Sequence, residues 1–213
     1  LKDRDSNSNN NQWQISSSHI GDKYGYFTTD AFAAGAAMKP TSGDDTTFTT
    51  GIGANQNIIN TSNESGDRYI AYLWHSVSGY SKFGTYSGTG SAGNAITGLG
   101  FRPAFVMIKR TDSAGSWYIH DNTRNPFNPA EDLLSPNNSD AETTFSNNKI
   151  DLDSDGFTIQ GTAGDHNASG GTYFYAAFAG GLDTIAPVNT DGSLTTRVKA
   201  SDDTGFSIVR YEG

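Results

Sequence analysis

The sequence predicts an all-β protein made of tandem antiparallel β-sandwich modules of the jelly-roll type. Three observations lead to this fold class. Aromatic residues make up 12% of the chain although hydrophobic residues make up only 34%, a combination that suits short strands joined by turns rather than disorder. Short strand-like runs alternate with turn residues, and glycine alone occurs 25 times. Finally, the beginning of the chain repeats its middle.

The repeat appears when residues 1–76 are laid over residues 108–180. Matching blocks occur in the same order in both segments, while the loops between them differ in length. Repeated blocks in a fixed order are typical of tandem modules. The matched blocks are Leu1-Lys2 with Ile108-Lys109, Asp5-Ser6 with Asp112-Ser113, Trp13-Gln14-Ile15 with Trp117-Tyr118-Ile119, Thr46-Thr47-Phe48 with Thr143-Thr144-Phe145, and ESGDRYIAYLW (64–74) with ASGGTYFYAAF (168–178). At the end of the chain, IVRYEG (208–213) matches FGTYSG (83–88) in the same way.

The repeat divides the chain into four parts. We expect residues 77–181 to form one complete module and residues 1–76 to form the C-terminal part of a module before it. Residues 205–213 match the first strand of a following module. Residues 182–204 contain few large apolar residues and are predicted to be a linker. On this interpretation the chain is a stretch of a longer tandem array.

Strands are predicted within the complete module at 80–88, 104–110, 116–121, 156–161 and 172–180. Each run is rich in aromatic or β-branched residues and is bounded by turn residues. The second and third runs are predicted to pair as a hairpin. The last run is apolar on both faces, which predicts a central strand that is covered on both sides.

Three shorter segments lie outside these strands. NPAEDLLS (128–135) and the Ala-rich segment 29–38 are predicted to form short helical turns, the first because a proline suits the start of a helix. The run GTGSAG (88–93) contains no Lys and precedes no predicted helix, so we interpret it as a hairpin loop rather than a phosphate-binding loop.

The charge and composition exclude several classes of partner. The net charge of −9 argues against nucleic acid, because phosphate binding needs clustered Lys and Arg. No apolar run approaches the ~20 residues of a membrane-spanning helix, so no membrane insertion is expected. The absence of cysteine excludes disulfides and thiolate metal sites. The four histidines are far apart in sequence and show no ligand spacing.

Calcium is the one cofactor that the sequence suggests. Asp151, Asp153, Asp155 and Gly156 match the first acidic positions and the glycine of a calcium loop. Thr162 stands where such a loop has its final glutamate, and no helices flank the segment. The alternative is a β-turn at 154–157 whose acidic side chains are solvated.

A sugar-binding surface is the candidate ligand site. Sugars stack on aromatic rings and bind planar polar groups. The alternative for the tryptophan of this set is a core position, because it recurs as Trp13. The candidate residues are Trp117, Tyr118, Asp121, Asn122 and Arg124.

No catalytic residues are expected. A glycosidase on this fold would need two carboxylates about 5–9.5 Å apart, and no strand carries the alternating pair of acids typical of such enzymes. The nucleophile motif G-x-S-x-G is absent as well. The carboxylates that a glycosidase could use are Asp112, Asp121, Glu131, Asp132 and Asp165.

The complete module resembles a known family. The runs GLGFRPAFVMIKRTDSAGSWYIHDNTR, DSDGFTIQG and NASGGTYFYAAFA resemble a domain of unknown function that is repeated in structural proteins of tailed bacteriophages, especially marine ones. The resemblance covers residues 80–180 well and residues 1–76 more weakly, and the pattern is lost between 20 and 45. It implies a concanavalin-like jelly roll in a virion fibre, appendage or capsid-surface protein, and it carries over no activity, because none can be transferred residue by residue.

Three functions follow from these observations. The first is a non-enzymatic phage virion protein on the particle surface, whose partners are copies of itself and other virion proteins. The second is a lectin-like module that recognises glycans of the host surface. The third, from a different class, is a polysaccharide-degrading enzyme. Repeated modules suit the first, because multivalency turns weak contacts into avidity.

Overall fold

The computed structural model describes residues 2–3, 13–21, 23–34, 40–43, 48–50 and 68–180. The predicted linker (182–204) and the predicted strand of a following module (205–213) lie outside these residues. Residues 1–179 belong to one compact unit of the chain.

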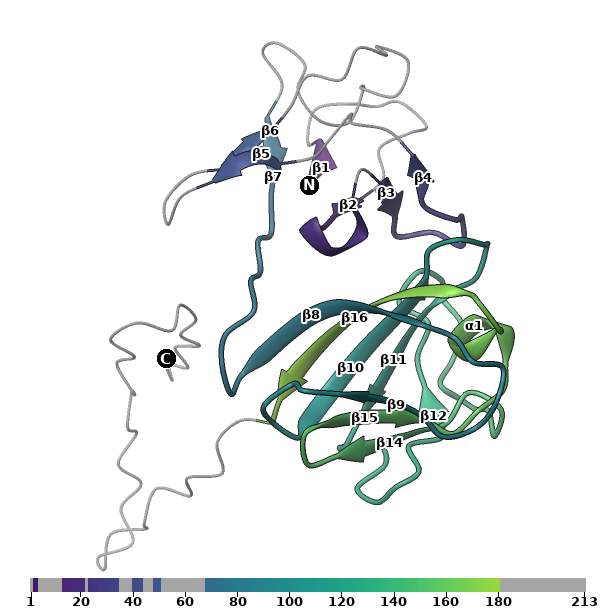
Figure 1. The fold of residues 1–213 in the computed structure, drawn as a ribbon. Helices are drawn as coiled ribbons and strands as arrows, with labels where there is room; N and C mark the ends of the chain where they lie inside the picture. Colours follow the sequence, from purple (N-terminus) through teal and green to yellow (C-terminus); the bar gives the residue numbers. More distant parts are fainter. Residues whose placement is uncertain are drawn as a thin grey trace, which may run out of the picture. The chain divides into compact units, whose positions relative to one another are not determined.

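Two antiparallel sheets lie within residues 77–181, the segment that we predict to be a complete module and refer to by that name (Figure 1). The larger sheet has the strand order β11-β10-β16-β8, and the smaller has the order β14-β15-β9. The strands are β8 (Ser81–Ser87), β9 (Asn94–Thr97), β10 (Pro103–Arg110), β11 (Trp117–Asp121), β14 (Ile150–Asp153), β15 (Gly156–Ile159) and β16 (Thr172–Ala179). A two-stranded sheet of β12 (Asp132–Leu133) and β13 (Thr143–Thr144) and one helical turn, α1 (Gly164–Asn167), complete the module.

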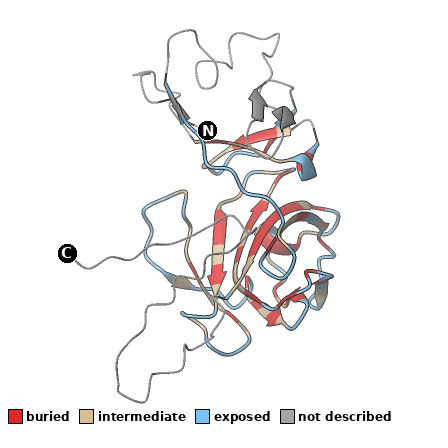
Figure 2. Cartoon of the chain, turned by 90° about the vertical axis from the view of Figure 1, so that its left-hand side faces the viewer, coloured by how far each residue is buried: buried red, intermediate tan, exposed pale blue. Residues whose placement is uncertain are grey.

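The main core lies between these two sheets. Val106 and Ile108 of β10 are fully buried in the same hydrophobic cluster as Leu152, Phe157 and Ile159 of the smaller sheet. Figure 2 shows the buried residues concentrated along the strands of the module. Two sheets that bury their facing sides in this way are a β-sandwich, which confirms the all-β, antiparallel sandwich part of the predicted fold class. The tandem arrangement of modules stays a prediction.

Strand β16 is the central strand that the sequence predicts. It lies between β10 and β8, and its residues alternate between two hydrophobic clusters. Tyr173 and Tyr175 point into the core between the sheets, whereas Phe174 and Ala176 join a second cluster on the outer face. The predicted hairpin of β10 and β11 is confirmed as well, with Lys109 opposite Trp117.

The β14–β15 hairpin needs a glycine directly after its turn. Asp153 pairs with Gly156, so the turn consists of Ser154 and Asp155. Gly156 has φ +156°, and a Cβ atom there would lie 2.0 Å from the carbonyl oxygen of Ile96. A turn is therefore present, one residue earlier than the predicted 154–157, and only glycine fits its end.

Shorter strands precede the module. β2 (Gln14–Ser16), β3 (Lys23–Tyr26) and β4 (Ala33–Ala34) form a sheet, with the 3₁₀ turn η1 (Ser18–Ile20) after β2. Two further pairs are β1 (Lys2–Asp3) with β7 (Tyr69–Ile70), and β5 (Pro40–Gly43) with β6 (Phe48–Thr50).

Three local predictions were wrong. Residues 128–135 are not helical, because Ala130 exchanges both backbone hydrogen bonds with Ile150 and β12 follows it. In the segment 29–38, the described residues 29–34 are not helical, because Ala33–Ala34 pairs with β3 as a strand, and residues 35–38 lie outside the described residues. The run 88–93 is not a hairpin loop, since β8 and β9, which it connects, lie in different sheets.

Helix is nearly absent from the described residues. The one α-helix among them, α1, was not predicted and has four residues. No helix within the described ranges is long and apolar enough to cross a membrane.

Candidate functional site

A second hydrophobic cluster on the outer face of the larger sheet is the candidate functional site, which we call the junction. The sheet contributes Trp117, Phe174 and Ala176, and the residues before the module contribute Ile20 and Phe32. Five partly buried residues surround this cluster: Ile15, Phe27, Phe83, Met107 and Phe178. Residues 13–34 therefore cover a sheet face that would otherwise be apolar and exposed.

Trp117 lies at the centre of the junction and is fully buried. Its ring stacks on Phe27 with centroids 4.8 Å apart and planes 11° apart. Its Nε1 donates a hydrogen bond of 3.1 Å to the carbonyl oxygen of Tyr26. A buried tryptophan whose N–H also finds a partner gains both apolar burial and a satisfied polar group.

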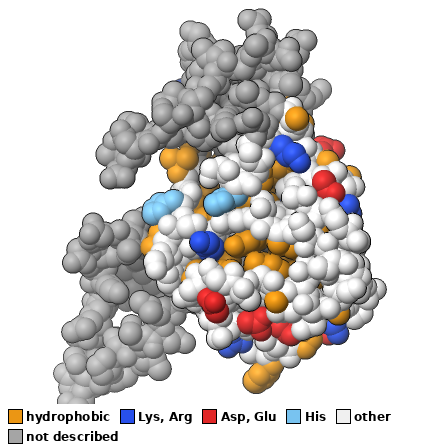
Figure 3. All heavy atoms as spheres, viewed as in Figure 1, with side chains coloured by type: hydrophobic (Ala, Val, Ile, Leu, Met, Phe, Trp, Pro, Cys, Tyr) orange, Lys and Arg blue, Asp and Glu red, His pale blue; other side chains and the backbone are white. Residues whose placement is uncertain are grey.

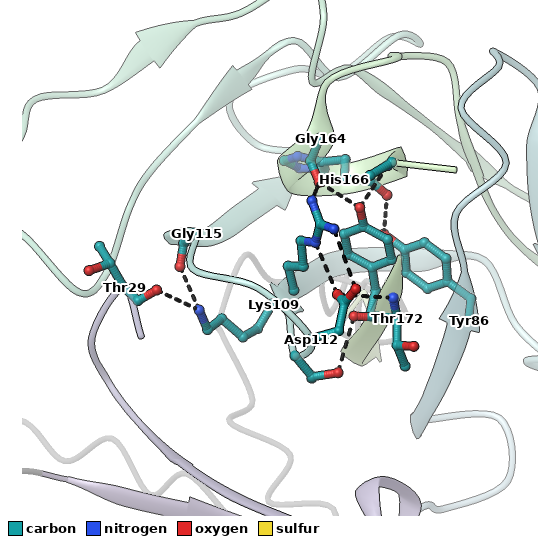
Figure 4. A network of polar contacts seen from close by, with 12 residues as sticks. Thr29, Tyr86, Lys109, Asp112, Gly115, Gly164, His166 and Thr172 are labelled. Carbon is teal, nitrogen blue, oxygen red and sulfur yellow. Dashed lines mark hydrogen bonds and ion pairs between the residues drawn. The ribbon is translucent and has the colours of Figure 1, made fainter. Parts of the chain in front are cut away.

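Lys109 crosses the junction with a fully buried side chain. Its Nζ donates to the carbonyl oxygens of Thr29 (3.3 Å) and Gly115 (2.5 Å), as Figure 4 shows. Burial lowers the pKa of Lys109 to about 8, against the opposing attraction of Asp30 and Asp165. The side chain thus connects the segment before the module to the β10–β11 loop.

Two backbone hydrogen bonds join the same segments. Phe32 N donates to Thr111 O at 3.0 Å, and Gly115 N donates to Thr29 O at 2.8 Å. These bonds and those of Lys109 fix the orientation of the two segments, and Trp117 supplies apolar contact area. Such a surface suits the rigid joining of consecutive parts of a chain.

A polar cluster surrounds the end of α1 inside the same module (Figure 4). Arg110 donates to the Asp112 carboxylate at 3.0 Å and to Gly164 O at 3.1 Å, and the bond to Arg110 lowers the pKa of Asp112. The hydroxyl of Tyr173 donates to the same Gly164 oxygen. These bonds tie α1 to β10 and β16, so we interpret the cluster as structural.

Two histidines meet in the interior. His120 and His166 are both fully buried, and their Nε2 atoms lie 2.9 Å apart. Burial lowers the pKa of His120 to about 4, and burial together with His120 lowers that of His166. Sequence reasoning missed this pair, because 46 residues separate the two and no spacing rule connects a strand to a distant helical turn.

The predicted sugar-binding residues do not form one surface. Trp117 is buried in the junction, and Tyr118 is nearly buried on the opposite face of the sheet, where its hydroxyl donates to Asp165 at 3.0 Å. Asp121 and Arg124 form an ion pair, and Asn122 is exposed beside them. A sugar site on this chain would therefore rest on the last three residues rather than on the tryptophan.

The three predicted calcium ligands each have a partner within the chain. Asp151 accepts from Gln160 Nε2 (2.6 Å) and Asp153 from Thr158 Oγ1 (2.7 Å). Asp155 accepts from the backbone N–H groups of Gly98 (3.2 Å) and Gly100 (2.6 Å). No group of three or more His, Cys, Asp or Glu residues in the described part of the chain is placed to hold a metal ion. Calcium binding stays a prediction.

Each carboxylate considered for glycosidase chemistry is likewise bonded within the chain. Besides the three already described, Glu131 lies 3.9 Å from Lys149 Nζ, and Asp132 accepts from Asn125 Nδ2 at 2.9 Å.

In Figure 3, acidic side chains gather along the lower edge of the visible face, where Figure 1 places β14 and β15.

Comparison with known proteins places the chain in one family. No curated protein sequence and no solved structure matches it. One family model matches residues 2–181, which include both the segment before the complete module and the module itself. The chain therefore belongs to the family described as a domain of unknown function, DUF7483.

Proposed function

We propose that the protein is a non-enzymatic structural component of a phage virion, in a fibre, appendage or capsid surface, and that it is built of tandem β-sandwich modules. The observation that carries this proposal is the junction. An apolar sheet face centred on Trp117 is covered by the segment that precedes the module. A chain of modules joined in this way extends a rod or covers a surface without a reactive site.

The pairing of β1 with β7 supports tandem modules. The sequence repeat places Lys2 on Lys109 and Tyr69 on Tyr173. In the complete module, Lys109 is opposite Phe174 and Arg110 is opposite Tyr173. In the N-terminal segment, Lys2 is opposite Ile70 and Asp3 is opposite Tyr69. The backbone register is therefore the same in both copies, as expected of two versions of one sheet.

The turns that follow β2 and β11, the next pair of repeated strands, also correspond to each other. The repeat aligns Ser17 with Asp121. The side chain of Ser17 accepts a hydrogen bond from the N–H two residues later, and that of Asp121 does the same. Ile15 pairs with Gly25 after this turn, and the aligned Ile119 pairs with Leu134. Two different side chains thus stabilise the same strand end in the same way.

The bonding of the acidic residues supports a role without catalysis. A general acid or nucleophile must be available to a substrate. The candidate carboxylates instead hold Arg, Lys, Tyr or Asn side chains of their own chain. The bacteriophage resemblance of residues 80–180 supplies the cellular context, a particle surface, where apolar junctions and avidity matter more than turnover.

Glycan recognition is the second candidate. It is favoured by Asn122, which is exposed beside Arg124, whose guanidinium is held by Asp121 and by Glu142 at 2.9 Å. Fixed planar polar groups of this kind bind sugar hydroxyls. A polysaccharide-degrading function would need an exposed pair of carboxylates in addition.

Immunogold labelling of virus particles purified from the source tests the proposal. We expect label on a fibre or another projecting structure. Particles that carry no label, while the antibody recognises the folded protein in solution, would overturn the virion assignment. Binding of the purified protein to host surface polysaccharide, compared with Arg124→Ala, then decides the second candidate.

A further inference from the structure

We propose that Ile70, Tyr72 and Trp74 form a docking face for a second copy of this chain, and that the docking loop of that copy is the one carrying Phe127. The inference rests on the tandem-module part of the proposed function. It adds a site, an occupant and a mode of assembly that the proposed function does not specify.

The docking face is apolar and exposed. The exposed fractions of Ile70, Tyr72 and Trp74 are 39%, 58% and 64%. The two aromatic rings of the face lie together, because the centroid of Tyr72 is 5.9 Å from that of Trp74, and it is also 5.3 Å from that of Trp13. Soluble proteins rarely expose contiguous aromatic surface of this kind unless something binds it.

The same positions in the complete module are covered. The register shared by the two copies places Ile70 on Phe174. Continued past the end of β7 at Ile70, it places Tyr72 on Ala176 and Trp74 on Phe178. All three counterparts belong to the junction. Leu73, which is also exposed, corresponds to Ala177 on the inner face and is not part of the docking face. The aligned apolar positions are therefore covered in the complete module and exposed in the N-terminal segment.

The covered copy shows what fits such a face. Ile20 lies in η1, between β2 and β3, and is buried in the junction. In the complete module the connection between β11 and β12 has the place of this turn, because both follow the repeated strand and precede its bridge partner. That connection carries Phe127, which is 81% exposed and the most exposed of the large hydrophobic residues described.

Phe127 is therefore placed like a docking residue without a partner. The docking face and the Phe127 loop are different surfaces of one chain, so the contact between copies is heterologous and continues head to tail. In the junction, Ile20 is accompanied by the aromatic rings of Phe27 and Phe32. Residues 134–142, which follow β12, contain no aromatic side chain that would play the same part beside Phe127. We therefore expect reversible association that is weaker than the internal junction and depends on concentration.

Sedimentation velocity of the full chain over a concentration series tests the proposal. The sedimentation coefficient of the wild type should rise with concentration. Phe127→Ser and Trp74→Ser should each weaken self-association by about tenfold or more, the effect of removing one aromatic anchor. Phe145→Ser is the matched control, because Phe145 is also exposed (47%) but belongs neither to the docking face nor to the connection between β11 and β12.

Mixing the two variants gives the sharper result. Phe127→Ser retains a docking face and Trp74→Ser retains a docking loop, so an equimolar mixture should form one-to-one dimers that do not grow further. A contact that used the same patch on both copies would not be restored by mixing. Circular dichroism and the melting temperature of each variant establish that it is folded.

A wild type that stays monomeric at its highest soluble concentration would overturn the inference, as would variants that associate as well as the wild type. A mixture without dimers would also overturn it. These failures differ from that of the proposed function, because unlabelled particles would leave self-association intact, and a monomeric chain could still be found on particles.

Discussion

Phe27 lies flat against Trp117, with the ring centroids 4.8 Å apart, although 90 residues of chain separate the two positions. This contact joins the segment before the module to the outer face of its larger sheet. Because the indole is buried and its N–H is bonded to the carbonyl oxygen of Tyr26, we expect the junction to contribute substantially to the free energy of unfolding.

Trp117→Ala should lower the free energy of unfolding by about 3–5 kcal/mol, the usual cost of removing a buried tryptophan. The loss includes the hydrogen bond to Tyr26 O. Urea unfolding measures it, with Phe145→Ala as the control, since that exposed ring should contribute within about 0.5 kcal/mol. A change below 1 kcal/mol for Trp117→Ala would mean that the junction does not stabilise the chain.

Lys109 gives stability a dependence on alkaline pH. Its pKa is about 8 in the folded protein and 10.5 in the unfolded chain, so between these values the unfolded state binds more protons. Stability should rise with pH across this window relative to Lys109→Met, which keeps the apolar stem. The difference between the two proteins cancels the titration of the tyrosines. If the difference does not change between pH 7.5 and 10.5, Lys109 does not titrate as described.

The histidine pair should make the protein sensitive to acid. The pKa of His120 is lowered to about 4 and that of His166 is lowered as well, against 6.5 in the unfolded chain. As pH falls through 6.5, the unfolded state gains protons first, so stability is lost progressively towards about pH 4. The double variant His120→Gln/His166→Gln should lose less stability between pH 7 and 5 in thermal unfolding. The exposed His75→Gln serves as control and should follow the wild type.

Asp155 should matter for stability whether or not calcium is present. Its carboxylate accepts from Gly98 N and Gly100 N, so Asp155→Ala should cost about 1 kcal/mol or more by leaving those groups without this partner. The loss should be equal in EDTA and in calcium. A destabilisation seen only with calcium, together with a lower melting temperature of the wild type in EDTA, would instead support the calcium loop.

The sequence predicted correctly those strands and turns whose pairing partners are close in sequence. The hairpin of β10 and β11 and the turn at Ser154-Asp155 depend on alternation and turn residues close in sequence. The central position of β16 followed from apolar residues on both of its faces. The recurrence of Trp117 as Trp13 favoured a core position, and that interpretation of the tryptophan agrees with its burial.

Pairing between distant segments could not be predicted. The run 88–93 changes sheets because β9 pairs with β15, more than 50 residues away. Ala130 is held in an extended strand by Ile150 rather than in a helical turn. The histidine pair and the Lys109 contact to Thr29 O arise in the same way, from partners that no local pattern identifies.

The accessibility of Trp117 tests the central claim, that residues 13–34 cover the outer face of the larger sheet. In a chain with Trp13→Phe and Trp74→Phe, Trp117 is the one remaining tryptophan, since the sequence contains three. We expect blue-shifted emission that acrylamide barely quenches, and red-shifted, quenchable emission after Phe27→Ala. An indole that acrylamide quenches freely in the intact, folded chain would contradict the junction and the proposals built on it.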